Sequence, residues 1–261
     1  MRRDSPSILD TRAGRSFSGG AAISRRGTRN LRPTSAAVAR AWAPRYRTEA
    51  SHKQLESLLG EWAWSLLAFR PLFSVFFSVY RFVRLAGSSA SPFSIWPSVR
   101  REFFVQLALL PLLRARLSRP VGSRGRVYFT DASSIGGAVV SRPVSLPHVT
   151  CVAVDTSRVW KYPAHINELE FRSVLEMLGL AEKGHTHQLR VDSQVVLGIL
   201  RKGRSSSWSL NKLSRKAAGL QLARGVGVNV VYVPSAENPA DGPSRGEGGT
   251  AALQRYLDEW L

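Results

Sequence analysis

The sequence predicts an α/β protein in which helices flank a mixed sheet and a helical segment precedes it. Apolar runs typical of strands begin at residue 126 and occur at 126–131, 137–142, 149–155, 187–192 and 228–233. Helical periodicity separates the later runs, at 167–182, 193–202 and 209–224, and a short helix is expected near 239–245. A strand meander followed by alternating helices and strands is typical of a layered α/β domain.

The residues before the sheet divide into two regions. The first 48 residues hold eleven arginines and two aspartates among many Ser, Gly and Ala, so residues 1–50 are predicted to be a disordered basic leader. Residues 51–120 read as helices at 54–67, 71–85 and 98–117, with Pro71 starting the second. The longest uninterrupted apolar piece of this segment, Pro71 to Tyr80, is ten residues, whereas a spanning helix needs about 20, so no membrane partner is expected.

The charge balance indicates a polyanionic partner. The chain has 261 residues, 37 Lys+Arg against 18 Asp+Glu, and a net charge of +19. Nucleic acid or an acidic membrane surface would suit this balance, while an arginine-biased genome would produce it without any such partner. The single cysteine, Cys151, excludes an intrachain disulfide and fits a cytoplasmic or nuclear protein better than a secreted one.

Two predicted strands end in the same way. Asp131 ends the strand 126–131 and is followed closely by Ser133 and Ser134, and Asp192 ends the strand 187–192 and is followed by Ser193. A carboxylate at the end of a core strand costs desolvation unless a cation or a donor compensates it. Alone, either acid is also explained by an ordinary polar turn.

Two further acids are candidates for the same site. Glu170 lies at the edge of the apolar stripe of the helix 167–182, although a capping box with Asn167 as N-cap would explain it without catalysis. Asp241 follows the strand 228–233 in a loop rich in Pro and Gly, and an Asp-Gly turn would also explain it. Four converging acids would need strong countercharge, which a divalent metal supplies.

These segments together resemble a known family, the type 1 ribonuclease H domain of retroelement reverse transcriptases, with DIRS-type and gypsy-type elements the most similar. The resemblance covers about 121–246 and is carried by Thr130-Asp131-Ala-Ser133, His165-Ile-Asn-Glu-Leu-Glu170, Val191-Asp192-Ser193 and Asn238-Pro-Ala-Asp241-Gly-Pro-Ser-Arg245. Residues 51–120 look like the thumb and connection that precede such a nuclease. No aspartate occurs between Glu49 and Thr130, so the paired aspartates of a polymerase palm are absent from this stretch. Residues 247–261 are expected to form an amphipathic helix.

The resemblance implies a fold and an activity. It implies a ribonuclease H-like five-stranded mixed sheet, with Asp131, Glu170, Asp192 and Asp241 as catalytic and metal-binding residues. The implied cofactor is Mg²⁺, with Mn²⁺ able to substitute. The implied reaction is two-metal hydrolysis of the RNA strand of an RNA–DNA hybrid, with no small-molecule substrate. The alternative is a catalytically inactive remnant that still binds nucleic acid.

Contacts to nucleic acid are expected from side chains around these acids and from a basic stretch after them. Arg201 to Trp208 combines cations, hydroxyls and one aromatic ring, although a solvated helix end would have the same composition. The residues predicted to bind nucleic acid are Ser133, Ser134, Ser193, Arg201, Lys202, Arg204, Trp208, Arg215 and Asn238.

Overall fold

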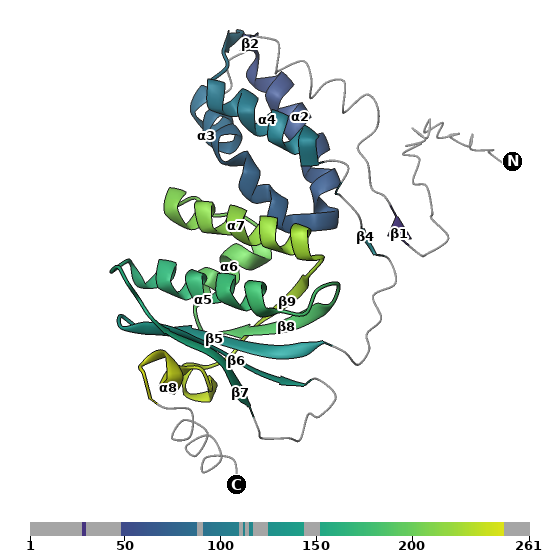
Figure 1. The fold of residues 1–261 in the computed structure, drawn as a ribbon. Helices are drawn as coiled ribbons and strands as arrows, with labels where there is room; N and C mark the ends of the chain where they lie inside the picture. The colour runs from purple at the N-terminus through teal and green to yellow at the C-terminus, as the bar shows by residue number, and fades with distance from the viewer. Residues whose placement is uncertain are drawn as a thin grey trace, which may run out of the picture.

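The main sheet of the protein has five strands. The structure is a computed structural model that describes residues 28–29, 48–87, 91–109, 112, 115–116, 125–143 and 152–247 (Figure 1). The strands are β5 (Arg126–Ala132), β6 (Gly136–Pro143), β7 (Ala153–Val159), β8 (Thr186–Val191) and β9 (Gly227–Tyr232), in the spatial order β7-β6-β5-β8-β9. β5 and β6 pair antiparallel, as do β6 and β7, whereas β8 is parallel to both β5 and β9. The predicted five-stranded mixed sheet is confirmed.

Helices cover both faces of this sheet. The helices α5 (Ile166–Leu180), α6 (Gln194–Lys202) and α7 (Trp208–Arg224) lie on one side, and the short α8 (Asp241–Ser244) lies on the other (Figure 1). Each face of the sheet has its own apolar core, and alternate residues of β5 belong to different cores, because successive strand side chains point to opposite faces. Tyr128 packs with the helices, while Val127 and Phe129 belong to the cluster that contains Ala240, next to α8.

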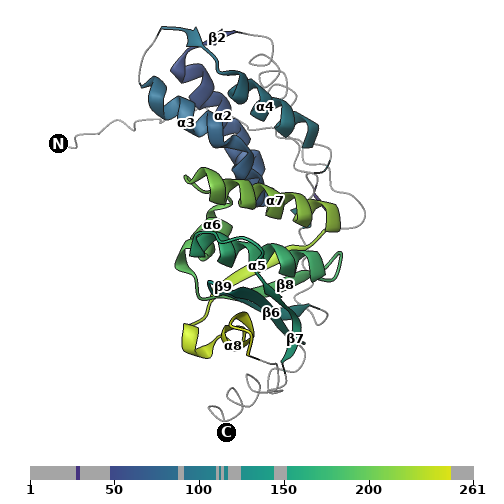
Figure 2. The same ribbon diagram turned by 60° about the vertical axis from the view of Figure 1, so that its left-hand side comes forward.

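A second layer of helices stacks on α7. It consists of α2 (His52–Leu66), the 3₁₀ helix η1 (Leu67–Phe76), α3 (Phe77–Ala86) and α4 (Pro97–Leu109), and both views place it on the side of α7 away from the sheet (Figures 1 and 2). Its core is a single apolar cluster of buried residues that includes Ala218 of α7. The short strands are β1 (Thr28–Arg29) paired with β4 (Ala115–Arg116) and β2 (Glu49–Ala50) paired with β3 (Phe93–Ser94).

Three predicted elements differ from the structure. The helix expected at 98–117 is shorter, because α4 covers Pro97–Leu109 and Ala115–Arg116 form the strand β4. The expected α-helix 71–85 is wrong at its start: Pro71 lies inside η1, Phe69 has non-helical angles (φ −145°, ψ 75°), and α3 begins at Phe77. Proline cannot donate the backbone hydrogen bond that a continuous helix needs there. The strand expected at 149–155 is observed as β7, Ala153–Val159, which extends beyond the expected end, and residues 149–151 lie outside the described part of the chain. The predicted leader falls largely outside the described residues, and the predicted C-terminal helix lies outside them except for Glu247.

The run 52–86 has the length and mean hydropathy of a membrane span. Its most apolar 18-residue window has a mean hydropathy of 1.5, and 44% of that window is buried inside the protein. Core helices of proteins without a membrane also meet these criteria. Trp62, Phe76 and Phe103 illustrate the packing, since all three are fully buried. The ring centroid of Phe76 lies 6.2 Å from that of Trp62 and 5.3 Å from that of Phe103.

A partly buried ion pair joins the second helical layer to α7. Glu102 accepts hydrogen bonds from the backbone N–H groups of Ser78 (2.9 Å) and Val79 (3.0 Å), which stabilises the first turn of α3. The guanidinium of Arg215, on α7, donates to Glu102 Oε1 (2.7 Å) and to the backbone oxygens of Ser74 and Val75 (both 2.9 Å). One arginine therefore satisfies three acceptors of the helical layer.

We expect Glu102→Ala to lower the free energy of unfolding by about 2–3 kcal/mol, because it removes the carboxylate that pairs with Arg215 and leaves two backbone donors without their acceptor. Urea denaturation followed by circular dichroism measures this change. The control is Glu56→Ala, whose exposed carboxylate contacts only His52 in the described residues and which should change stability by less than about 1 kcal/mol. Equal effects of the two substitutions would contradict the assigned role of Glu102.

Candidate metal centre and its family

The register of the sheet brings Asp131 and Asp192 together. β5 and β8 are parallel neighbours, and Thr130 pairs with Val191, so the residue after each lies at the same edge. Parallel strands present their carboxyl ends on one side of the sheet, where polar side chains of the following turns gather. Within each turn a serine fixes the chain: Ser133 accepts from Gly136 N (3.1 Å), and Ser193 is the N-cap of α6 and accepts from Val196 N (3.4 Å).

Glu170 reaches the same place from α5. A carboxylate oxygen of each of Asp131, Glu170 and Asp192 lies within 4.8 Å of the others, and this is the group in the described part of the chain that could hold a metal ion. The capping-box interpretation of Glu170 is wrong. The N-cap of α5 is His165, whose Nδ1 accepts from Asn167 N (3.3 Å), so the helix begins before Asn167 and Glu170 lies beyond the capping position. We call these three acids the carboxylate cluster.

The carboxylate cluster is electrostatically unfavourable without a cation. Burial raises the pKa of Asp131 above its ordinary value, a hydrogen bond from Ser244 lowers it, and the charges of Asp192 and Asp241 raise it further. Burial, followed by the charges of Asp131 and Asp192, raises the pKa of Glu170 to about 8. Near neutral pH, Glu170 therefore holds a proton unless positive charge displaces it.

Two serines complete the surroundings of the cluster. Ser244 Oγ donates to Asp131 Oδ2 (2.5 Å) and lies 2.8 Å from the backbone oxygen of Asp241. Ser235 Oγ donates to Asp192 Oδ2 (2.9 Å), whereas Asp192 Oδ1 is buried and has no hydrogen-bond partner among the described residues. Sequence reasoning missed both serines. Ser244 lies within a recognised motif, but no sequence signal marks Ser235.

Asp241 lies beside the carboxylate cluster but is not among the three acids within 4.8 Å. It begins α8, and its Oδ1 accepts from Arg245 (2.7 Å) while its charge still acts on Asp131. α8 is attached to the sheet by hydrogen bonds from Ser133 Oγ to the backbone oxygen of Ser244 and from Ser157 Oγ to that of Pro243, both 2.8 Å. The structure therefore brings three of the four predicted acids together and places the fourth at their edge.

The cluster suits a hard divalent cation. All its ligands are oxygens, they repel one another, and Asp192 Oδ1, which has no partner among the residues that the structure describes, offers an acceptor position that a cation could fill. Oxygen-only carboxylate sites favour Mg²⁺ or Mn²⁺ over zinc.

The residues predicted to bind nucleic acid fall into two groups. Ser134, Arg201, Lys202, Arg204 and Trp208 are exposed, and the guanidinium of Arg204 lies 4.1 Å from the ring centroid of Tyr80. The others hold the fold: Ser133 and Ser193 fix turns, Arg215 joins α7 to the helical layer, and Asn238 is buried and donates to the backbone oxygen of Thr130 (3.2 Å). Isolated motifs cannot reveal the contacts of Arg215 and Asn238, because their partners lie more than 100 residues away in the sequence.

The chain is similar to known proteins in two comparisons. Its sequence matches the family described as DNA polymerase (viral) C-terminal domain over residues 88–257. Among solved structures, it is similar to the N-terminal RNase H domain of a Mycobacterium tuberculosis protein (20% identity, TM-score 0.37, covering 51% of this chain and 99% of that one). It is also similar to LC11-RNase H1 in complex with an RNA/DNA hybrid (15%, 0.39, 48% and 98%) and to RNase H1 of Halobacterium salinarum (20%, 0.34, 51% and 98%).

None of the curated proteins matches the sequence. The fold itself rests on the observed strand order and directions, which do not depend on the structural similarities. The family match spans more than half of the 261 residues and includes the whole sheet and the carboxylate cluster. The protein therefore belongs to the family of viral DNA polymerase C-terminal domains, in agreement with its resemblance to the ribonuclease H domain of reverse transcriptases.

Proposed function

We propose that this protein is a metal-dependent endonuclease that hydrolyses the RNA strand of RNA–DNA hybrids. The observation that supports this function best is the carboxylate cluster, in which Asp131 of β5, Glu170 of α5 and Asp192 just after β8 come together. The family to which the chain belongs and its net charge of +19 support a nucleic-acid substrate. The proposed nuclease unit is 121–246, preceded by a basic leader (1–50) and a helical segment (51–120) and followed by a C-terminal helix (247–261).

In this proposal the acids of the cluster bind the metal and two serines orient them. Asp131, Glu170 and Asp192 would hold Mg²⁺, or Mn²⁺ in its place, with Asp241 joining them when its contact with Arg245 is released. When bound, paired ions would activate water and stabilise the leaving oxygen of the phosphodiester. Ser244 orients Asp131, and Ser235 orients Asp192, by the hydrogen bonds that each donates. Glu170 and nearby backbone groups would recognise the 2′-hydroxyl, the group that distinguishes RNA from DNA.

The test is cleavage of a hybrid by the purified full chain. We expect a hybrid with a labelled RNA strand to be cut in Mg²⁺ or Mn²⁺ and to stay intact in EDTA, because the three acids repel one another without a cation. The same hybrid labelled on its DNA strand is the control and should stay intact. Products are resolved on a denaturing gel.

A second candidate function is that of a nucleic-acid-binding remnant without activity. No acidic residue occurs between Ser193 and Ala236, a stretch that contains seven lysines and arginines. The exposed cations of this stretch, such as Arg201, Lys202, Lys212 and Lys216, would bind a polyanion whether or not the carboxylate cluster holds metal. Binding of the hybrid without cutting in either metal ion would favour this second function over the first.

A further inference from the structure

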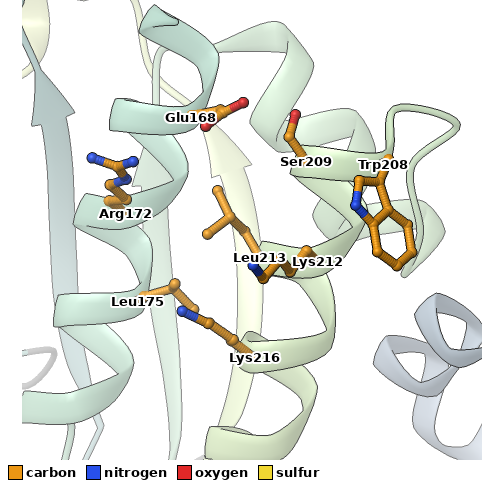
Figure 3. Close-up of a pocket in the computed structure, with 8 residues that line it drawn as sticks. All are labelled: Glu168, Arg172, Leu175, Trp208, Ser209, Lys212, Leu213 and Lys216. Carbon is orange, nitrogen blue, oxygen red and sulfur yellow. The ribbon is translucent and has the colours of Figure 1, made fainter. Parts of the chain in front are cut away.

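An open groove runs between α5 and α7. Its volume is about 470 Å³. Figure 3 shows Glu168, Arg172 and Leu175 on α5 beside the residues of α7, with Leu213 and Leu175 between the two helices. Glu168 and Glu170 are two residues apart on a helix, so they point in different directions: Glu170 contributes to the carboxylate cluster and Glu168 lines the groove.

The α7 side of the groove carries positive charge. Trp208, Lys212 and Lys216 are spaced by four residues, so they form one stripe along the helix, and all three are exposed. Arg172 faces this stripe from α5, and Glu168 is the one acid among the lining residues. α7 itself has no Asp or Glu from Trp208 to Arg224. The groove therefore attracts anions.

An aromatic ring stands at the rim of this groove. The indole of Trp208 is 55% exposed, and Figure 3 shows it at the first turn of α7. Its position is fixed by packing, because its centroid lies 5.2 Å from that of Phe77 and 5.5 Å from the guanidinium of Arg215. A large aromatic side chain that is held in place yet more than half exposed offers a stacking surface.

A second depression extends the groove across α5. Its volume is about 320 Å³, and it shares Arg172 and Leu175 with the first. It adds Lys161, whose Nζ lies 5.4 Å from the ring centroid of Tyr162, and the Tyr162 ring is 63% exposed. Cations and exposed aromatic rings thus recur along one continuous path.

We propose that this path, which we call the α5–α7 groove, binds a single strand of nucleic acid. A basic groove that follows the phosphates, combined with aromatic rings on which bases stack, is the arrangement by which proteins bind single strands with little sequence preference. Stacking on Trp208 or Tyr162 requires an unpaired base, which a duplex or a lipid surface does not present. The groove is lined by residues outside the carboxylate cluster, so the inference is independent of any cleavage activity.

The test measures the affinity of the full chain for a fluorescent single strand of 15 nucleotides, either oligo-dT or oligo-U. Affinity is measured by fluorescence anisotropy in EDTA over a range of salt concentrations. The variant Lys212→Gln/Lys216→Gln removes two phosphate contacts. The plot of log affinity against log salt should therefore become less steep by about 1.4. Trp208→Ala should weaken binding about fivefold or more at an unchanged salt slope, and Trp208→Phe should restore most of it.

The matched control is Lys53→Gln/Lys183→Gln, which removes the same charge from two exposed lysines outside the groove. Its salt slope should equal that of the parent. An equal loss of slope in this control, or no change in Lys212→Gln/Lys216→Gln, would overturn the proposal. The proposal would also be overturned if a blunt DNA duplex bound as tightly as the single strand and lost the same affinity on Trp208→Ala. If Lys212→Gln/Lys216→Gln lost binding to phosphatidylserine vesicles but kept the parent's affinity for the strand, the proposal would be overturned in favour of an acidic membrane surface.

Discussion

Asp192→Asn is expected to abolish metal-dependent cleavage of a hybrid. Asparagine has the same shape and keeps an oxygen that can accept from Ser235, so the turn after β8 should persist. The substitution removes one of the charges that would hold a cation, and a metal ion contributes several kcal/mol of transition-state stabilisation. The rate should therefore fall by about 10³-fold or more. Initial rates of RNA cleavage in Mg²⁺ measure the loss, and hybrid binding in EDTA should remain.

Asp155→Asn provides a control with the same chemical change. Asp155 is exposed on the edge strand β7 and does not belong to the carboxylate cluster. This variant should cleave the hybrid at the rate of the parent. If Asp192→Asn also retained that rate, the proposed metal centre would be wrong.

Glu170→Gln should stabilise the protein at alkaline pH in the absence of metal. Glu170 loses its proton near its ordinary pKa of 4.5 when unfolded and at about 8 when folded. Between these values the unfolded state binds fewer protons, so the free energy of unfolding of the parent falls as pH rises from about 4.5 to 8. Glutamine cannot ionise and escapes this loss, so at pH 8.5 the variant should be more stable by about 2–4 kcal/mol.

Urea denaturation at pH 5 and pH 8.5, in EDTA, measures this difference, and the two proteins should be closest in stability at the lower pH. Glu168→Gln is the control, because Glu168 lies on the same helix but outside the carboxylate cluster. Added Mg²⁺ should then stabilise the parent more than Glu170→Gln, since binding to the folded state adds to stability. Equal stability of parent and Glu170→Gln at pH 8.5 without metal would contradict the raised pKa of Glu170.

Strand patterns alone predicted much of this arrangement. Asp131 and Asp192 each end an apolar run, and the parallel pairing of β5 with β8 follows once a helix separates two strands of one sheet. The meander of β5, β6 and β7 follows from turn residues between apolar runs. These features are local, so periodicity and turn chemistry are enough to predict them.

The remaining features depend on distant contacts. Arg215 reads as an exposed basic residue, but its acceptors belong to a segment more than 100 residues earlier in the chain. Asn238 reads as part of a loop motif, but it is buried against Thr130. Asp241 is expected with the other acids, and its contact with Arg245 is set by the single turn of α8. Contacts across the fold decide the positions of Arg215 and Asn238, and such contacts are not visible in a local pattern, whereas the contact of Asp241 is a local pair four residues apart.

The distance along the chain between Asp131 and Ser244 has a consequence for biosynthesis. The two residues are 113 positions apart, and the hydroxyl of Ser244 is the one that holds the Asp131 carboxylate. A nascent chain leaves the ribosome at about 5–20 residues per second, so the last partner of Asp131 emerges on the order of 10 s after Asp131 itself. Until then the sheet can pair while the hydrogen bond that holds Asp131 is missing, so the proposed metal centre should reach its final geometry only after residue 244 has emerged.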